Sequence, residues 1–457
     1  MSLSGASVLS RSAAIAGNSN VTTDPAQIAA HEVDLKRPAA VVRPGSSEEV
    51  VELARFASQE KLAIVATGAQ TKLGIGMPPR QYDLALEMTR MDRIVAYDPG
   101  DLTLSVEPGI TLRKIASVLA EHRQFLPLGA AFGGRPTAGG TVASGVDSPM
   151  RHMYGTARDF VLGMEFVTGD GVEAKSGGRV VKNVTGYDIH KLMIGSLGTL
   201  GIITRINFRT FPQPQTARTC VATFRGSTGA CELRRRIAHS ALRPQSLEIL
   251  GASADCAPEL GRSAALSLEA GRWSVVATFA GDARVIDRNH RDMETLAQAA
   301  DHKSLESFGE LCDADSENAT RYVADFASLI LQYRPAAAIF KISALPGDLA
   351  GLAAGISSIE IGWAAMMRGL GVTYLGLLPP DDSERSFQLL QRVCSQVFTL
   401  AEKAPWGPSV LLWCPPKLKS EIDIWGAHRR DYPLMQKLKG VFDPSGILSP
   451  GRYVGGL

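Results

Sequence analysis

The chain has 457 residues, of which 45% are hydrophobic and 21% charged, and its formal net charge is +2. This length exceeds that of a single hydrophobic core, so we expect two or three domains, and the composition is that of a globular protein rather than a disordered one. The near-neutral charge excludes a field strong enough to indicate nucleic acid or an anionic membrane as the partner.

The six cysteines lie far apart and form no CxxC pair. This spacing argues against a zinc site, an iron–sulfur cluster or a disulfide framework, so we predict no metal site and expect reduced thiols. The first 20 residues contain no apolar run of the signal-peptide type, and no run approaches the roughly 18 apolar residues of a membrane helix. We therefore expect a cytoplasmic protein that meets a membrane only through a partner.

The first predicted elements form a βαβ unit. Residues 1–32 are expected to be a partly flexible N-terminal segment. A strand over 39–44, a helix opened by Ser46 and early glutamates, and a buried strand over 62–68 follow. The second strand of such a unit is expected to deliver its loop to a sheet edge, where a ligand can bind.

Strands joined by turns as well as by helices continue up to residue 211, which predicts an α+β fold. The prolines of FPQPQ (211–215) cannot continue a central strand and indicate a linker. We place one domain over 33–214, a second α+β domain over 215–408, and a C-terminal segment over 409–457 that ends in a helix and proline–glycine turns.

A first glycine-rich loop, TGAQTKLGIG (67–76), directly follows the buried strand. Such a loop lets successive N–H groups converge on an anion, and a diphosphate suits it. Its spacing is neither that of a P-loop nor GxGxxG, so an ATPase or a Rossmann domain is not the natural interpretation. An ordinary turn is the alternative explanation.

Small residues are densest in TAGGTVASG (137–145), YGT (154–156) and DFVLG (159–163). Each glycine in regular structure costs roughly 0.5–1 kcal/mol relative to alanine, so we expect a ligand to approach this backbone closely. A compact set of turns is the alternative. Farther on, Lys182, Asn183 and Tyr187 either face a ligand or cap turns, and 198–203 offers a backbone edge suited to a flat ring.

The ordered series of motifs carries a family resemblance. RPGSSEEV, TGAQTKLGIG, VEPGITL, TAGGTVASG, YGTARDFVLG, KNVTGYDIHKL, GSLGTLGIIT and FDPSGILSPGR together resemble FAD-linked oxidases of the vanillyl-alcohol-oxidase and p-cresol-methylhydroxylase (PCMH) type. KNVTGYDIHKL and TKLGIG look most like the FAD-binding subunit of bacterial glycolate oxidase. The resemblance covers about 33–214 and the last turn, whereas the middle of the chain resembles the family only in size and broad pattern.

This resemblance implies a PCMH-type FAD-binding domain of two α+β subdomains, an α+β cap or substrate domain over 215–408, and a C-terminal segment that returns to the FAD domain. FAD would extend between the two subdomains. The residues that the resemblance assigns to FAD are Thr67, Gly68, Ala69, Gln70, Thr71 and Lys72 at the diphosphate, Pro108 and Gly109 near the flavin ring, Gly139, Gly140, Thr141, Ala143, Ser144, Gly145, Gly155 and Thr156 along the middle, and Gly201, Ile202 and Ile203 at the adenine or ribityl side.

The sequence also departs from the family. Many relatives tether the flavin through a histidine in the first loop, but Ala69, Gln70 and Thr71 stand here, so we predict non-covalent, dissociable FAD. The histidines, His122, His152 and His190 among them, show no metal-ligand spacing such as HxxH. This puts unaided substrate oxidation in doubt, and no catalytic residue is assigned.

Three functions follow from the resemblance. The first is an FAD-binding subunit of a glycolate-oxidase-like complex, which acts on a 2-hydroxy acid beside a catalytic flavoprotein subunit and an iron–sulfur subunit. The second is a self-sufficient dehydrogenase or oxidase of a hydroxy acid or alcohol, with Lys182, Tyr187 or Arg452 as candidate bases. The third is a non-catalytic subunit in which FAD is a structural ligand.

Overall fold

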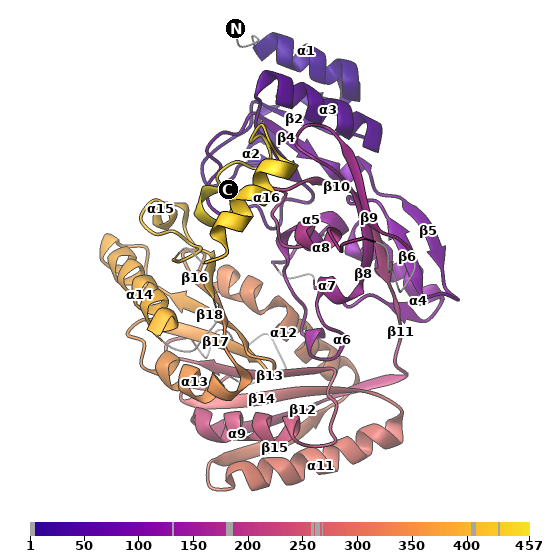
Figure 1. Cartoon of the computed structure of the whole chain (residues 1–457). Helices are drawn as coiled ribbons and strands as arrows, with labels where there is room; N and C mark the ends of the chain where they lie inside the picture. The colour runs from indigo at the N-terminus through magenta and orange to yellow at the C-terminus, as the bar shows by residue number, and fades with distance from the viewer. Residues whose placement is uncertain are drawn as a thin grey trace. The chain divides into compact units, whose positions relative to one another are not determined.

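The computed structural model describes residues 5–129, 132–179, 186–256, 260, 266, 268–403, 408–427 and 430–457 (Figure 1). The chain forms two compact units: the first comprises 1–147, 156–213 and 427–457, and the second comprises 148–155 and 214–426. Both units contain helices and sheets, which confirms the predicted α+β class. Among the described helices, none is both long and apolar enough to cross a membrane.

The first unit begins with a four-stranded sheet. Its strands, in spatial order, are β1 (Val21–Thr22), β2 (Ala40–Val42), β4 (Leu84–Glu87) and β3 (Ile64–Thr67). β4 runs parallel to both β2 and β3 and lies between them. β3 is therefore the edge strand, and the loop that follows it leaves from a sheet edge, as the sequence predicted.

Three helices accompany this sheet: α1 (Gly5–Ala16), α2 (Pro25–Ala30) and α3 (Ser47–Glu60). α3 begins as its sequence indicates, since the Ser46 hydroxyl accepts the N–H of Glu49. The segment 1–32, expected to be partly flexible, instead contains α1 and α2. Its order has a physical cause, because Ala16 of α1 is buried in the same hydrophobic core as Val50 and Leu53 of α3.

A five-stranded antiparallel sheet forms the other half of the first unit. Its strands, in spatial order, are β5 (Ile94–Asp98), β6 (Thr103–Val106), β10 (Ile202–Arg209), β8 (Val161–Val167) and β9 (Glu173–Gly177). The short strands β7 (Gln124–Phe125) and β11 (Phe211–Pro212) pair separately. The helices of this half of the first unit are α4 (Leu112–Glu121), α5 (Ala138–Ser144), α7 (Ala157–Phe160) and α8 (His190–Met193). Elsewhere in the first unit, short helical turns occur at η1 (Asn18–Asn20), η2 (Met88–Arg90) and η4 (Val454–Gly456).

The C-terminal residues complete the first unit. α16 (Tyr432–Phe442) ends at Asp443, whose buried carboxylate accepts the N–H groups of Ile447 and Leu448 at 3.0 and 2.9 Å. Lys439 Nζ donates to the same carboxylate and to the carbonyl of Thr199. The turn that follows adds to the edge of β3, where Ile64 exchanges backbone hydrogen bonds with residues 447 and 449.

An eight-stranded antiparallel sheet forms the second unit. Its strands, in spatial order, are β15 (Leu305–Leu311), β12 (Thr216–Arg225), β14 (Arg272–Gly281), β13 (Ser246–Ala252), β17 (Gly362–Arg368), β18 (Val372–Leu378), β16 (Ala338–Ser343) and β19 (Ser409–Trp413). Its helices are α6 (Arg151–Tyr154), α9 (Ser227–Ala238), α11 (Ala283–Asp301), α12 (Asp313–Tyr333), α13 (Leu349–Ser357), α14 (Glu384–Lys403) and α15 (Pro416–Lys419), with a short turn at η3 (Pro346–Asp348).

Two boundaries differ from those expected from the sequence. β19 pairs with β16, so the chain re-enters the first unit at residue 427 rather than at 409. Residues 148–155, which contain α6, belong to the second unit although both neighbouring segments belong to the first. A hydrophobic pattern such as SVLLW predicts a strand but does not show which sheet the strand joins. The order of the elements along the chain therefore assigned these segments to the wrong unit.

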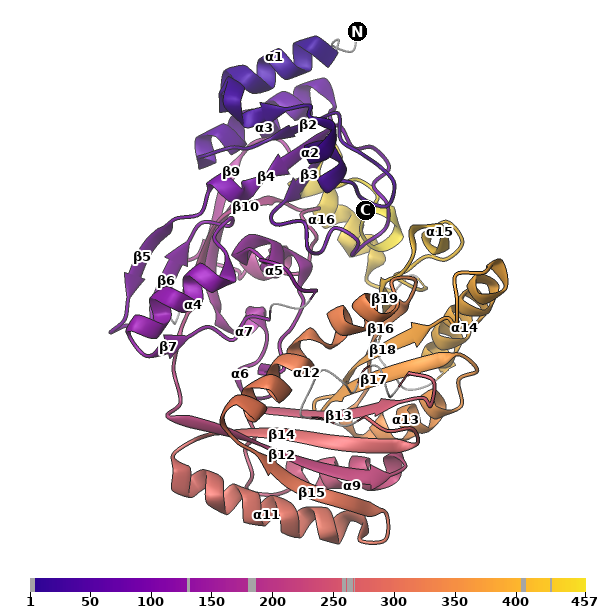
Figure 2. The same ribbon diagram turned by 180° about the vertical axis from the view of Figure 1, so that it is seen from behind.

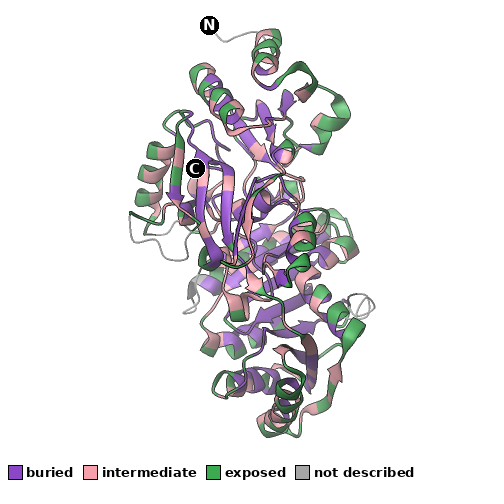
Figure 3. Ribbon diagram, turned by 90° about the vertical axis from the view of Figure 1, so that its right-hand side faces the viewer, coloured by how far each residue is buried: buried purple, intermediate pink, exposed green. Residues whose placement is uncertain are grey.

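The two faces of the second sheet are covered by different helices. The Thr219 hydroxyl of β12 lies 2.9 Å from that of Ser316 of α12, whereas the adjacent Cys220 lies beside His290 of α11. Because neighbouring residues of a strand point to opposite faces, α12 and α11 cover opposite sides of β12 (Figure 2). The strands of both units are mostly buried, and exposed residues gather on the outer faces of the helices (Figure 3).

Asp443→Asn tests the anchor of the C-terminal segment. The substitution leaves the buried Lys439 ammonium without its counter-ion, so we expect the free energy of unfolding of the first unit to fall by about 3 kcal/mol. Urea denaturation followed by far-ultraviolet circular dichroism measures this. All five tryptophans fall within the sequence range of the second unit, so tryptophan fluorescence follows that unit separately.

Lys437→Ala is the matched control, because Lys437 lies on the same helix but is exposed. It is expected to change the free energy of unfolding by less than about 0.5 kcal/mol. Equal stabilities of the Asp443→Asn and Lys437→Ala proteins would contradict the proposed anchor.

Candidate functional site

The first unit contains two adjoining hollows, which share Ala66, Thr67, Gly68, Thr137, Gly140 and Ala143 and so form one groove. We call it the backbone groove. Its lining residues are Ala66, Thr67, Gly68, Ala69, Gln70, Thr71, Lys72, Leu73, Met88, Pro108, Thr137, Gly139, Gly140, Ala143, Ser144, Leu197, Gly198, Gly201, Ile202, Ile203 and Arg452.

The groove brings together the residues assigned to a cofactor by resemblance, except Gly109, Thr141, Gly145, Gly155 and Thr156. Gly109 lies directly behind it, because a Cβ atom there would come within 2.1 Å of the Met88 carbonyl oxygen. Thr141 is buried inside α5, and Gly145 ends α5 in the left-handed conformation with φ of 63°. These three shape the walls without lining the hollow.

Gly155 and Thr156 have local structural roles. Gly155 ends α6 with φ of 77° and belongs to the second unit. Thr156 precedes α7 in the first unit, and its N–H donates to the Asp159 carboxylate at 2.7 Å. The sequence YGT thus contains a glycine that ends one helix and a threonine that caps the next, and both residues have a local structural role.

Sequence reasoning missed several lining residues, and two of them carried a signal. Met88 directly follows β4, and parallel strands β3 and β4 end at the same sheet edge, so residues after both strands meet. Thr137 precedes Ala-Gly-Gly as a helix cap, and its hydroxyl accepts the N–H of Gly140 at 3.3 Å. Leu197 follows no pattern that distinguishes it from other loop residues.

Two glycines allow the walls of the groove to meet. A Cβ atom on Gly68 would lie 2.2 Å from the Thr137 hydroxyl oxygen, and one on Gly139 would lie 2.6 Å from Cβ of Pro108. Real Cβ atoms do not tolerate such distances, so any larger residue would push the β3 loop away from α5. The glycine spacing therefore sets the width of the groove.

The loop after β3 presents free backbone donors. Among the described residues, no acceptor pairs with the N–H groups of residues 68–72, and Gln70 adopts a positive φ of 55°. Consecutive unpaired N–H groups around a left-handed residue form a concave anion site. The loop is therefore shaped for a group with several negatively charged oxygens.

Lys72 supplies a cation to the same loop. Its Nζ donates to the Thr71 hydroxyl at 3.2 Å, and within the described part of the chain no carboxylate forms an ion pair with it. Burial lowers the pKa of the Lys72 ammonium to about 8. A half-buried lysine with no acidic partner favours an anionic ligand as its counter-ion.

Gln70 stands where many relatives of the resembled family carry a tethering histidine. Its amide nitrogen donates to the Gly68 carbonyl at 2.6 Å and lies 3.1 Å from Nε2 of His31. His31 is buried, and its Nε2 also lies 3.3 Å from the Glu87 carboxylate. Burial opposes ionisation of Glu87, but hydrogen bonds from His31 and Thr89 and the charge of Arg43 outweigh it and lower the pKa of Glu87 to about 2.

A buried hydroxyl and an open strand edge complete the groove. Thr67 Oγ1 is buried and has no hydrogen-bond partner among the described residues, which marks a position where a polar ligand atom would be stabilised. Ile202 and Ile203 pair with β8 on one side, whereas pairing of β10 with β6 begins only at Ile206. The predicted backbone edge is thus open on one side.

Arg452 connects the C-terminal turn to the groove. Its guanidinium is buried and donates to the carbonyls of Leu73 and Ile75 at 2.6 and 2.5 Å. Burial lowers the pKa of Arg452, although Asp34 and Tyr82 oppose this, and a guanidinium stays protonated in proteins. Arg452 therefore fixes the loop and does not accept protons.

The other two residues considered as candidate bases are Tyr187 and Lys182. The Tyr187 residue is 89% exposed and does not line the groove. Lys182 and the neighbouring Asn183 lie outside the described residues. The arrangement accounts for binding of a cofactor, and it assigns no proton acceptor.

Comparisons with known families agree with this geometry. Residues 38–176 match the family described as "FAD binding domain", and residues 427–453 match "FAD linked oxidases, C-terminal domain". The second match begins where the chain re-enters the first unit. Both matched segments contribute to the backbone groove.

Three known proteins show how far the likeness extends. Glycolate oxidase subunit GlcD of Bacillus subtilis is 24% identical over 91% of this chain and 88% of its own length. D-2-hydroxyglutarate dehydrogenase of Xanthomonas citri pv. viticola is 27% identical over 94% of this chain and 93% of its own length. Glycolate oxidase subunit GlcE of Escherichia coli is 37% identical, but over only 37% of this chain and 48% of its own length.

Solved structures confirm the predicted PCMH-type fold. The 4-ethylphenol oxidase from Gulosibacter chungangensis superposes with a TM-score of 0.75 at 19% identity, covering 98% of this chain and 96% of that chain. A p-cresol methylhydroxylase superposes with a TM-score of 0.74 at 16% identity over the same shares. These likenesses concern the fold alone.

Arg452→Lys tests whether the C-terminal turn holds the loop after β3. The lysine side chain is shorter than that of arginine, so its ammonium is not expected to make both hydrogen bonds that the guanidinium donates to Leu73 and Ile75. Losing one charge-assisted hydrogen bond costs about 1.5–3 kcal/mol. We expect amide hydrogen exchange of Ile75 and Met77, whose N–H groups donate to the carbonyls of Lys72 and Arg452, to accelerate at least about tenfold, while exchange in α3 stays unchanged. Mass spectrometry of exchanged peptides measures this, with the exposed Arg113→Lys as control. Unchanged exchange in the loop would show that Arg452 is dispensable.

Proposed function

Because this chain belongs to the FAD-linked oxidases and is an FAD-dependent oxidoreductase, we propose that it takes part in the oxidation of a 2-hydroxy acid as the FAD-binding subunit of a glycolate-oxidase-like complex. The observation that carries the proposal is a groove lined by backbone, with free N–H groups and Lys72, in the unit that matches the FAD domain. The names of two relatives, GlcD and GlcE, supply the substrate class and the subunit character.

The residues of the groove fit FAD. The free N–H groups of residues 68–72 and the Lys72 ammonium suit a diphosphate, and the unpaired hydroxyl of Thr67 suits a polar atom of an extended ligand. The apolar end of the groove at Met88, Pro108 and Ile203 suits a flat ring. When bound, FAD supplies an acceptor for the two electrons released by the substrate.

We propose that FAD is held without a covalent bond. Gln70 occupies the position of the tether and has no nucleophilic atom, and the nearby His31 is buried, with Nδ1 bonded to the Gln27 carbonyl and Nε2 between Gln70 and Glu87. A histidine with both ring nitrogens engaged is not free to attach a flavin.

Oxidation of a 2-hydroxy acid removes a hydride equivalent from C2 and a proton from the hydroxyl, and yields the 2-oxo acid. The groove residues provide binding and orientation, and none of them is a suitable proton acceptor, since Lys72 belongs to the anion site and Arg452 is engaged with carbonyls. This favours a proton acceptor elsewhere, either in the second unit, for which we propose the role of cap or substrate domain, or in a partner. We propose a catalytic flavoprotein subunit and an iron–sulfur subunit as partners, with contact to a membrane only through them.

A self-sufficient dehydrogenase is the second candidate. The observation in its favour is the likeness over almost the full length of both chains to a protein named D-2-hydroxyglutarate dehydrogenase, a name that does not describe a subunit. In that case this chain alone would reduce its bound FAD with a 2-hydroxy acid.

Lys72→Met tests the assignment of the diphosphate to the loop after β3. The Lys72 ammonium is protonated below about pH 8 in the free protein, so FAD affinity is expected to be full below pH 7 and to fall as the pH rises above about 8. The substitution is expected to raise the Kd of FAD about tenfold to hundredfold at pH 7 and to abolish the pH dependence. Fluorescence titration of the apoprotein with FAD measures both, and the titration itself requires a dissociable cofactor.

The exposed Lys437→Met is the control for that titration and is expected to bind FAD like the unmodified chain. An unchanged pH profile in the Lys72→Met protein would place the diphosphate elsewhere. Flavin that stays attached to the denatured chain would contradict non-covalent binding.

Anaerobic mixing with a panel of 2-hydroxy acids tests the substrate class. We expect one of them to bleach the visible absorbance of the flavin, because transfer of two electrons removes the oxidised chromophore. If bleaching requires the partner subunits, the complex is supported; if the isolated chain bleaches fully, the self-sufficient dehydrogenase is supported instead. Absence of bleaching by every 2-hydroxy acid, with and without partners, would overturn the proposed substrate class. A panel of alcohols is the control for that outcome.

A further inference from the structure

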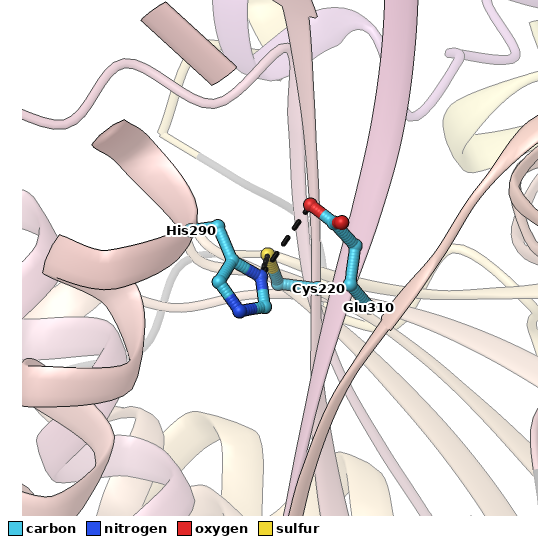
Figure 4. A group of neighbouring side chains, drawn as sticks. All are labelled: Cys220, His290 and Glu310. Atoms are coloured by element: carbon cyan, nitrogen blue, oxygen red, sulfur yellow. Dashed lines mark hydrogen bonds and ion pairs between the residues drawn. The ribbon is translucent and has the colours of Figure 1, made fainter. Parts of the chain in front are cut away.

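Three potential metal ligands meet on one face of the sheet of the second unit. Cys220 of β12 and Glu310 of β15 are direct partners in an antiparallel pair, so their side chains leave the sheet on the same face. His290 of α11 approaches them from above that face (Figure 4). Thiol, imidazole and carboxylate thus come from three separate elements.

The ligand atoms lie within a few tenths of an ångström to about one ångström of the separations that a tetrahedral metal requires. Cys220 Sγ lies 3.8 Å from Nδ1 of His290, which lies 3.4 Å from Oε1 of Glu310, and all three atoms are within 4.8 Å of one another. With a Zn–S bond of about 2.3 Å and Zn–N and Zn–O bonds of about 2.0–2.2 Å, tetrahedral ligand atoms lie about 3.3–3.6 Å apart. Small side-chain movements therefore suffice to enclose the ion.

The surroundings of the cluster leave these atoms available. Glu310 Oε1 is buried and accepts no hydrogen bond from the described residues, although it lies 3.4 Å from Nδ1 of His290, whereas Oε2 lies 3.4 Å from Nη1 of Arg218. Arg218 also donates a hydrogen bond to Asp287 at 2.8 Å, so the positive charge of its guanidinium is shared between the carboxylates of Asp287 and Glu310. Arg218 therefore orients Glu310 while leaving Oε1 to the cluster.

The histidine is both oriented and accessible. Its ring packs against that of Phe308 in a tilted arrangement, with centroids 5.2 Å apart, and its side chain is 29% exposed. Cys220, by contrast, is buried, and burial together with Glu310 raises the pKa of its thiol to about 12. An ion that enters past His290 would displace the thiol proton, as metal binding to cysteine does.

We propose that Cys220, His290 and Glu310 bind a zinc ion, with water as the fourth ligand. Sulfur, imidazole and carboxylate donors in tetrahedral separation favour zinc over calcium or magnesium, which take oxygen ligands only. The ion would join the edge strand β15 and helix α11 to β12, and so stabilise this side of the second unit. The exposed Cys312, whose Sγ lies 3.6 Å from Glu310 Oε2, stands beside the site.

Equilibrium dialysis of the full FAD-loaded chain against zinc, after treatment with a chelator, tests the proposal. We expect about one zinc ion per chain, and we expect Cys220→Ser, His290→Gln and Glu310→Gln each to weaken zinc binding at least about tenfold to hundredfold. Cys231→Ser, which removes a buried thiol from α9 of the same unit, is the matched control and should bind zinc like the unmodified chain.

A second readout guards against misfolded variants. Zinc is expected to raise the midpoint of thermal unfolding of the chain and of Cys231→Ser, but not of the three ligand variants. His290→Gln changes a partly exposed side chain, so it keeps the test valid if Cys220→Ser fails to fold. Absence of saturable zinc binding, or binding that persists in all three ligand variants, would overturn the proposal. The visible absorbance spectrum of the bound flavin reports FAD binding, and it does not depend on whether zinc binds.

Discussion

The C-terminal turn holds the loop after β3 in place, and the backbone groove depends on that contact. Asp443 orders residues 447 and 448, these pair with Ile64 at the edge of β3, and Arg452 then reaches the carbonyls of Leu73 and Ile75. A loop fixed by its neighbours does not have to use its own N–H groups for internal bonds. Residues 68–72 therefore stay ordered and keep their donors free for a ligand.

A groove made of backbone places a different demand on the sequence than one made of side chains. At Gly68 and Gly139 the requirement is the absence of a Cβ atom, since one would collide with Thr137 or Pro108. Such a requirement can be met by a short motif with correctly spaced glycines, whatever the surrounding residues are.

The same reasoning explains what could be predicted from the sequence. TGAQTKLGIG follows a buried strand, and a loop in that place is at a sheet edge by the geometry of parallel strands, so the sequence could place Gly68 and Lys72 in one loop, and both line the groove. Gly155 and Thr156 were assigned to the cofactor by the family resemblance and because YGT is similarly rich in small residues. In the structure they end one helix and begin another, and composition cannot distinguish a capping pair from a ligand-facing one.

The proposed zinc ligands could not be predicted from the sequence, for a different reason. Metal sites are recognisable in a sequence when their ligands share one turn or one helix, as in CxxC or HxxH, because the spacing then encodes the geometry. Cys220 and His290 are 70 residues apart, and their meeting depends on α11 crossing the face of β12. Strand register decides the third ligand, because Glu310 faces Cys220 only in the observed pairing and a slip of one residue would turn it to the opposite face. Ligands that tertiary packing brings together leave no spacing to find, so the prediction of no metal site rested on a pattern that this kind of site does not produce.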